Sequence, residues 1–316
     1  MTSDRQRTAI PVVVNAGLAT LFLLLNAWLW ILLPLLLPLL PALGWSLLPV
    51  VLLTTSYWSV LHEGIHAVLH PNRRVNDALS RWLAIGFPAP FAVLRFGHLK
   101  HHQFNRTAID RSEVYDAAQR SRWRAALGYY PQLLIGLYAS EVLALLLVWL
   151  PPGLLLRLAR RLPAEHGLPP LAHSIDRQLL RADALRAIRV DSAASLTLIA
   201  LGVWLYGPHG WMLLLALLGR GMLMSLTDNA YHYGTPLHAP GSDVQFALNL
   251  RLPRLASALI LHFNYHAVHH RQPALPWCAL PDAARADELC SAPGYAAALL
   301  AQLRGPIASR DLPQRS

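Results

Sequence analysis

Residues Trp45 to His66 read WSLLPVVLLTTSYWSVLHEGIH. The stretch is an apolar run of about the length that a membrane helix needs, and it ends, without an intervening loop, in the pair His62 and His66. Two histidines four residues apart lie on one face of a helix, and neutral imidazole is the commonest metal ligand in proteins. The stretch therefore predicts a metal-binding face at the end of a membrane-spanning helix.

Two further clusters repeat this chemistry, with the sequences HLKHH and HAVHH. Both have the spacing i, i+3, i+4, which places three imidazoles on one helical face. Eight imidazoles exceed what one tetrahedral zinc ion needs, so the three clusters predict two metal ions. Two identical spacings make unrelated core histidines a poor explanation. The clustered histidines are His62, His66, His98, His101, His102, His266, His269 and His270.

The composition is that of a polytopic membrane protein. Of the 316 residues, 54% are hydrophobic and 14% are charged, whereas soluble domains carry about 25% charged residues. The net charge of +10 comes almost wholly from arginines that flank apolar runs, a distribution typical of membrane topology and not of a nucleic-acid surface. We expect one membrane domain over residues 1–276, and a polar tail over 277–316 that packs on, or trails from, the metal-binding cap.

The first two apolar runs, Val12–Leu33 and Trp45–Leu61, predict a hairpin that returns the chain to its starting side. Arg5 and Arg7 precede the first run, so the positive-inside rule places that side, and the first cluster, in the cytoplasm. The turn is expected where prolines break the helix, at Pro34, Pro38 and Pro41.

A second hairpin is predicted from Ser195–Tyr206 and Trp211–Leu226, joined by the turn sequence Gly-Pro-His-Gly at 207–210; one continuous span through this turn is the alternative. All three clusters then share one membrane face only if Ala126–Leu158 does not cross the membrane alone. We therefore expect that segment to be re-entrant or interfacial, and Pro71–Gly97 to form an interfacial helix. The fold class is all-α, with about four membrane helices in two hairpins.

The order and sequences of the boxes HEGIH, HLKHH and HAVHH resemble the membrane fatty acid desaturase family over roughly residues 12–276. The resemblance implies a cytoplasmic diiron centre that activates dioxygen and removes hydrogen from an unactivated methylene of a lipid acyl chain. It implies that the eight clustered histidines are iron ligands. It also implies a ninth histidine ligand, His232. The family has an asparagine four residues before that histidine, whereas this chain has Asp228.

Two carboxylates near the ligands are candidate catalytic residues. Asp228 could bind iron directly or through water, because a carboxylate is competent for either. Glu63 could orient a ligating histidine or cap a polar helix face. His70 and His262 are spaced to lie near the boxes, but ligation and plain packing are equally consistent with their positions.

Other functions are also consistent with these histidine motifs. A hydroxylase, ketolase or decarboxylase could use similar boxes. HEGIH also matches the H-E-x-x-H motif of zinc proteases, although that hypothesis leaves both H-x-x-H-H clusters unexplained. A non-catalytic metal-binding protein is a third class. The sequence has no H-P-G-G haem motif, cysteine cluster or flavin fingerprint, so we expect a separate electron donor such as a ferredoxin or cytochrome, and an inner-membrane location with the metal site facing the cytoplasm.

Overall fold

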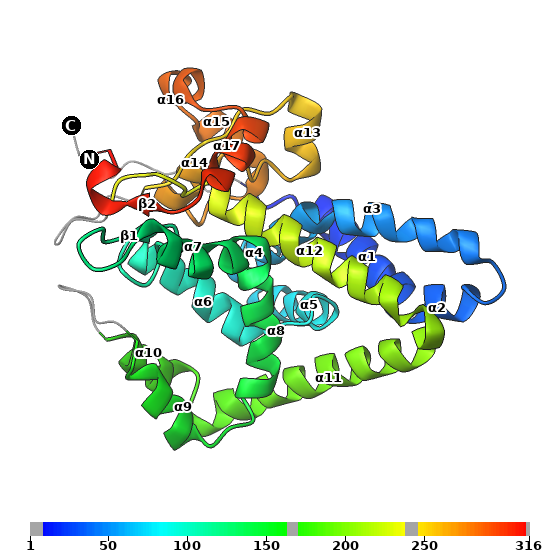
Figure 1. The fold of residues 1–316 in the computed structure, drawn as a ribbon. Coiled ribbons are helices and arrows are strands. Elements are labelled where there is room, and N and C mark those ends of the chain that lie inside the picture. Colours follow the sequence, from blue (N-terminus) through cyan, green and yellow to red (C-terminus); the bar gives the residue numbers. More distant parts are fainter. Residues whose placement is uncertain (1–8, 163–169, 238–245, 314–316) are drawn as a thin grey trace.

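The computed structural model describes residues 9–162, 170–237 and 246–313. The described chain is helical apart from one small parallel sheet (Figure 1). In this sheet β1 (Val114–Tyr115) pairs with β2 (Ile307–Ala308), which joins the loop after the second histidine box to the end of the chain. The fold class predicted from the sequence, an all-helical membrane protein, is confirmed.

The first span is one helical stretch of 25 residues, Val12–Leu36. It consists of α1 (Val12–Ala27), a π-helical segment at Trp28–Leu32, and α2 (Leu33–Leu36). The expectation that Pro34 ends the span is wrong. A proline has no N–H for the helix ladder, and the wider π turns immediately before Pro34 accommodate this loss while the helix continues. The chain turns only after Leu36.

The return arm of this hairpin is bent. A 3-10 segment (Pro41–Ser46) and α3 (Leu47–Leu52) lead to α4 (Thr54–Ile65), which is inclined by 47° to the preceding helix. All of α4 is buried. The bend directs the HEGIH box, at the end of α4, into the protein interior.

The second hairpin consists of α11 (Ala182–Tyr206) and α12 (Gly210–Ala230), and the chain reverses at Gly207, whose φ is +46°. The positive φ favours glycine at this position. A Cβ added to Gly202 would contact both Trp30 and Leu213, so the two arms lie face to face and against the first span. The hairpin prediction therefore holds, and the alternative of one continuous span does not.

By length and composition, three helical stretches could cross a membrane, or four if the bent pair counts as one span. One of them is Arg122–Leu147, which contains α7 (Arg122–Pro131), a π-helical segment (Gln132–Gly136) and α8 (Leu137–Leu147). Figure 1 shows α8 running across the direction of α1, α11 and α12. This orientation agrees with the expectation that the segment makes no unpaired crossing.

The expected interfacial segment consists of two helices, α5 (Arg73–Gly86) and α6 (Phe91–Phe104). The Asn72 side chain caps α5 by accepting hydrogen bonds from the N–H groups of residues 74 and 75, as expected for a helix N-cap. Arg81 of α5 forms an ion pair with the buried Asp191 of α11. The second histidine box lies at the end of α6, facing α4.

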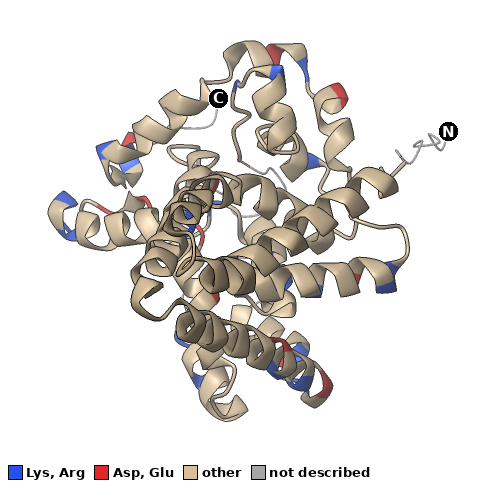
Figure 2. Cartoon of the chain, turned by 90° about the vertical axis from the view of Figure 1, so that its right-hand side faces the viewer, with Lys and Arg blue, Asp and Glu red and all other residues tan. Residues whose placement is uncertain are grey.

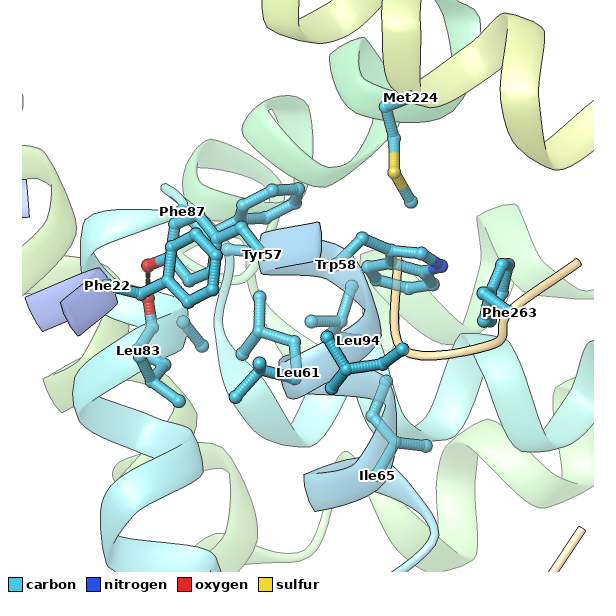
Figure 3. Close-up of a cluster of buried hydrophobic side chains, with 14 of the residues drawn as sticks. Phe22, Tyr57, Trp58, Leu61, Ile65, Leu83, Phe87, Leu94, Met224 and Phe263 are labelled. Atoms are coloured by element: carbon cyan, nitrogen blue, oxygen red, sulfur yellow. Dashed lines mark hydrogen bonds between the residues drawn. The ribbon is translucent and has the colours of Figure 1, made fainter. Parts of the chain in front are cut away.

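The core lies between the two hairpins and α5 (Figure 3). Phe22 of α1 stacks on Tyr57 of α4 with ring centroids 4.7 Å apart, and the Tyr57 hydroxyl donates a hydrogen bond of 2.5 Å to the Leu83 carbonyl of α5. Three elements are thus joined by one side chain. Figure 2, viewed from the right-hand side of Figure 1, shows most Lys and Arg on the outer elements; α12 carries one buried arginine, Arg220.

Gln302 fixes the chain end to α12, because its Nε2 donates to the Leu226 carbonyl and its Oε1 accepts from Asn229.

The remaining helices are short. These short helices are α9 (Pro152–Ala159), α10 (Leu171–Gln178), α13 (Arg254–Leu259), α14 (His266–Arg271), α15 (Leu280–Ala283), α16 (Ala286–Ser291) and α17 (Tyr295–Ala301).

Candidate metal centre

Nine histidines from four parts of the chain converge in two groups, each with its potential ligand atoms within 4.8 Å of one another. They come from the end of α4, the end of α6, the turn after α12, and α14. All nine were predicted from the sequence as metal ligands. The first group is His62, His66, His98, His102 and His269, and the second is His101, His232, His266 and His270.

The rings of the first group point their Nε2 atoms toward one centre. The Nε2 atoms of His66 and His98 are 3.0 Å apart, those of His98 and His102 are 3.1 Å apart, and those of His102 and His269 are 3.0 Å apart. The buried Nε2 of His62 has no hydrogen-bond partner. A ligand atom without a partner, facing four others, is what a site for a cation requires.

The second group has the same arrangement. The His232 Nε2 is 3.1 Å from that of His101 and 3.2 Å from that of His266, and the His266 Nε2 is 3.1 Å from that of His270. The groups are contiguous, because the ring centroids of His102 and His270 are 4.3 Å apart. Two centres of this kind could hold a pair of metal ions side by side.

The spacing of the nitrogen atoms fits coordination numbers above four. At a metal–nitrogen distance of about 2.1 Å, neighbouring ligands in a tetrahedron are about 3.4 Å apart, whereas ligands at right angles are about 3.0 Å apart. The shortest separations, 3.0–3.2 Å, lie nearer the second value, and all ligand atoms of a group lie within 4.8 Å of one another. The residues present therefore fit two imidazole-rich iron sites better than one structural zinc site.

Burial keeps most of these rings in the neutral form that binds metals. Desolvation, and then repulsion by neighbouring histidines, lowers the pKa of His98 and His269 well below the usual range. Burial lowers the pKa of His66 to about 4 and that of His102 to about 2. His101 differs: burial alone would lower its pKa, but the Asp110 and Asp228 carboxylates together raise it.

Polar partners fix the ring orientation of two ligands in the second group. The His101 Nδ1 is 2.7 Å from Asp110 Oδ1, and the His232 Nδ1 is 3.0 Å from the Phe246 carbonyl. Such contacts orient the ring, and a carboxylate partner increases the basicity of a ligand. Asp110 had no assigned role in the sequence analysis, because no helical spacing connects it with a box. The nine-residue separation from His101 spans a loop.

A buried ion pair fixes this loop. Arg106 and Glu113, each 1% exposed, are joined at 2.7 Å, and Arg106 also donates to the Thr235 carbonyl at 3.0 Å. Arg106 has φ +63°, a strained conformation that persists only where surrounding contacts enforce it. The pair therefore connects the loop after the second box to the segment after His232.

Asn249 fixes the third box. Its side-chain oxygen accepts hydrogen bonds from the N–H groups of Ala267 and Val268, at 3.0 and 3.3 Å. These are free N–H groups in the first turn of α14, which a side-chain acceptor can satisfy. No sequence signal indicates this role, because Asn249 lies 17 positions before the first residue of α14.

The two predicted carboxylates lie in different places. Glu63 is buried next to the first group, and its Oε2 accepts a hydrogen bond of 3.1 Å from the backbone N–H of Trp277; in the described chain it bonds no histidine ring. Asp228 lines a cavity together with His98, His101 and His232. Neither His70 nor His262 belongs to a histidine group; the Nδ1 of His262 is 2.7 Å from the Ser257 hydroxyl.

The comparison with known families agrees with this geometry. The family model described as fatty acid desaturase matches residues 37–297. The chain belongs to the fatty acid desaturase family. The match covers most of the chain and includes all three histidine boxes, so the resemblance predicted from the boxes is confirmed. No protein of curated function matches the chain.

This desaturase-family enzyme is therefore a membrane oxidoreductase with histidine clusters of the kind that form the family's diiron centre. Membership of the family implies a lipid substrate and dioxygen. The zinc-protease hypothesis drawn from HEGIH has no support in the site, since His62 and His66 belong to a group of five histidines.

Proposed function

We propose that this protein is a diiron desaturase that removes two hydrogens from a lipid acyl chain, with dioxygen and externally supplied electrons. The observation that carries the proposal is the convergence of nine histidines into contiguous groups of five and four at the end of the spans, in a chain of the desaturase family. Each group offers enough imidazoles to bind one iron with a coordination position left for oxygen or water.

The chain's own residues hold and orient this centre. The first group would bind one iron and the second the other, and bound irons would supply the activation of dioxygen for C–H cleavage. Asp110 orients the His101 ring. Asp228 lies at the cavity wall beside the second group, where a carboxylate could bind iron directly or through a water molecule.

The substrate position is indicated by a cavity of about 340 Å³ that borders both groups. This volume lies within the usual range for ligand sites, roughly 300–1,000 Å³. Trp58, Leu94, Leu133 and Leu137 form an apolar wall, suited to an acyl chain. Much of the remaining lining is polar, unlike the wholly apolar tunnel that a plain acyl chain would need.

The proposed orientation places the metal centre in the cytoplasm, where a separate ferredoxin or cytochrome would supply electrons. Arg5 and Arg7 lie outside the described residues. The support comes from α9, α10 and the start of α11, which lie at the same end of the bundle as β1 (Figure 1). These elements carry Arg157, Arg160, Arg177, Arg181 and Arg186, as the positive-inside rule expects of cytoplasmic segments.

Metal analysis combined with lipid analysis tests the proposal. The purified protein should contain about two irons per chain, and the iron-loaded, reduced protein should consume dioxygen in the presence of lipid. Expression in a host of defined lipid composition should produce new double bonds. New hydroxyl groups instead would indicate a hydroxylase on the same centre. One zinc per chain, or no oxygen consumption with any lipid, would contradict the proposal.

A further inference from the structure

The polar wall of the cavity contains a carboxylate without a partner. Glu141 of α8 lines the cavity, and its Oε2 is buried without a hydrogen bond. Glu141 forms no ion pair in the described part of the chain; Arg220, the buried cation on α12, lies over the rings of Tyr57 and Phe87 at 5.2 and 5.5 Å. A buried carboxylate without a partner is costly, so its presence needs an explanation.

The neighbouring polar groups on this wall already have partners. The Ser225 hydroxyl accepts a hydrogen bond of 3.3 Å from the Leu137 N–H, and the Ser140 hydroxyl donates one of 2.6 Å to the Leu137 carbonyl. Asn229 donates to Gln302 at 2.7 Å. Among these groups, Glu141 is the one with a buried side-chain oxygen that has no partner in the described part of the chain.

The wall toward the core has a second unpartnered polar atom, the buried Nε1 of Trp58. Trp58 lies between Met224 and Leu94, and its ring nitrogen is at the edge nearer Phe263 (Figure 3). The residues that line the cavity thus include one buried acceptor and one buried donor that no protein group satisfies. A buried polar group that is left unsatisfied destabilises the protein, so a ligand that bonds either one gains affinity.

Glu141 belongs to neither histidine group, although it lines the same cavity as His98, His101 and His232. It follows Leu137 by one helical turn in α8, and the Leu137 N–H donates to the Ser225 hydroxyl of α12. A group held by Glu141 would therefore lie in the cavity that the metal groups border, and not at a ligand position.

We propose that the substrate carries a hydroxyl group, bound by the Glu141 carboxylate, on an otherwise apolar chain. A hydroxyl can donate to a carboxylate, whereas a ketone only accepts. Burial of an ammonium also costs far more than burial of a hydroxyl. The inference rests on the proposed function for the identity of the reacting centre, and it narrows the substrate class to hydroxylated lipids.

Ligand binding to the zinc-loaded protein tests this inference without any redox step. The probes are stearic acid and a series of hydroxystearic acids that differ in hydroxyl position, each measured by displacement of a fluorescent fatty acid. At least one isomer with a mid-chain or distal hydroxyl should bind about tenfold more tightly than stearic acid. In Glu141→Leu this preference should disappear, whereas Glu141→Gln should keep it. The control Leu143→Ala, at a half-exposed position on the same helix, should leave it unchanged.

Equal binding of all isomers and stearic acid by the wild-type protein would overturn the inference, whether or not Glu141→Leu folds. Retention of the preference in a folded Glu141→Leu would also overturn it. Equal binding together with slowed oxygen consumption in Glu141→Leu would instead assign Glu141 to proton supply. If the hydroxyl preference holds and the iron-loaded protein consumes no dioxygen, the proposed function fails and the hydroxyl site stands.

Discussion

His269 and His270 are adjacent in the sequence, but their rings belong to different metal groups, and the same is true of His101 and His102. Consecutive side chains on a helix point about 100° apart, so a histidine pair at the end of a helix can face two centres at once. The doubled histidine in each H-x-x-H-H box therefore lets one short helix contribute to both metal sites. This arrangement keeps the two groups adjacent.

Removing one member of such a pair should empty one site more than the other. We expect His269→Ala and His270→Ala each to lower the iron content from about two per chain to one or fewer, because each removes a ligand from a different group. The control is His173→Ala, at an exposed position of α10, which should retain both irons. Elemental analysis of the purified variants measures the effect. Full iron content and activity in either variant would remove that residue from the ligand set.

The Asp110 carboxylate, which orients the His101 ring, should contribute almost as much to iron binding as a ligand does. Replacing the oriented partner of a metal-bound histidine typically costs 10–100-fold in metal affinity, so Asp110→Asn should weaken iron binding by about that factor. Competition with a chelator measures the affinity. Asp116→Asn is the matched control, since Asp116 is an exposed residue of the same loop and accepts a hydrogen bond from the N–H of Ala118. Equal affinities for both variants would contradict the role of Asp110.

All nine histidines could be predicted because helical spacing, and the resemblance for His232, link them to one another in the sequence. Asp110, Asn249 and Glu141 could not. Their roles depend on how a loop closes, on a capping side chain 17 residues before its helix, and on the angle at which α8 meets α12. None of these leaves a periodic signal. The tertiary contacts that support a metal centre are thus harder to predict than the ligands themselves.

At the scale of elements, the second hairpin packs closely against the first span at Gly202. A Cβ at Gly202 of α11 would come within 2.7 Å of the Trp30 ring in the first span, closer than real Cβ atoms approach. Gly202→Ala should therefore destabilise the protein by roughly 1–3 kcal/mol, as expected for overpacking in a well-packed core. The midpoint of thermal unfolding in detergent measures the effect.

Gly128→Ala in α7 is the matched control, because a Cβ at that position meets nothing within 4 Å. It should leave stability unchanged or raise it, since alanine is the better helix former. If Gly202→Ala unfolds at the same temperature as the wild-type protein, this result would contradict the close packing of Gly202 against Trp30.

Prolines explain where the predicted elements differ from those observed. The rule that proline ends a helix gave a boundary at Pro34, but a π-helical segment precedes this residue and the span continues. Likewise, Pro131 lies inside α7 and is followed by the π-helical segment Gln132–Gly136, which lines the cavity. The prolines indicate in the sequence that both helices are irregular at these positions. They do not indicate whether the helix ends or continues through a π-helical segment, because packing against neighbouring helices decides between the two.

At the scale of the whole molecule, the site requires an even number of crossings between the histidine boxes. The second hairpin, which lies between the second and third boxes, supplies two crossings, provided that α7 and α8 lie within one face of the membrane. The length and composition of the helices do not decide whether α7 and α8 cross the membrane, since Arg122–Leu147 is long and apolar enough to do so. The orientation of α8 across the bundle (Figure 1) supports the arrangement in which the loop before α7 and helix α10 share one side.

Cysteine labelling tests this topology. In a variant with Cys278 and Cys290 replaced by serine, single cysteines at Gln119, before α7, and at Asp176, in α10, should react with a membrane-impermeant maleimide from the same side. Both positions are exposed, and both lie at the end of the bundle that carries β1. A cysteine at the exposed Ala42, in the turn between the first two spans, should react only from the opposite side. Labelling of Gln119 and Asp176 from opposite sides would mean that Arg122–Leu147 crosses the membrane, and the packing of α8 across the bundle would then be wrong.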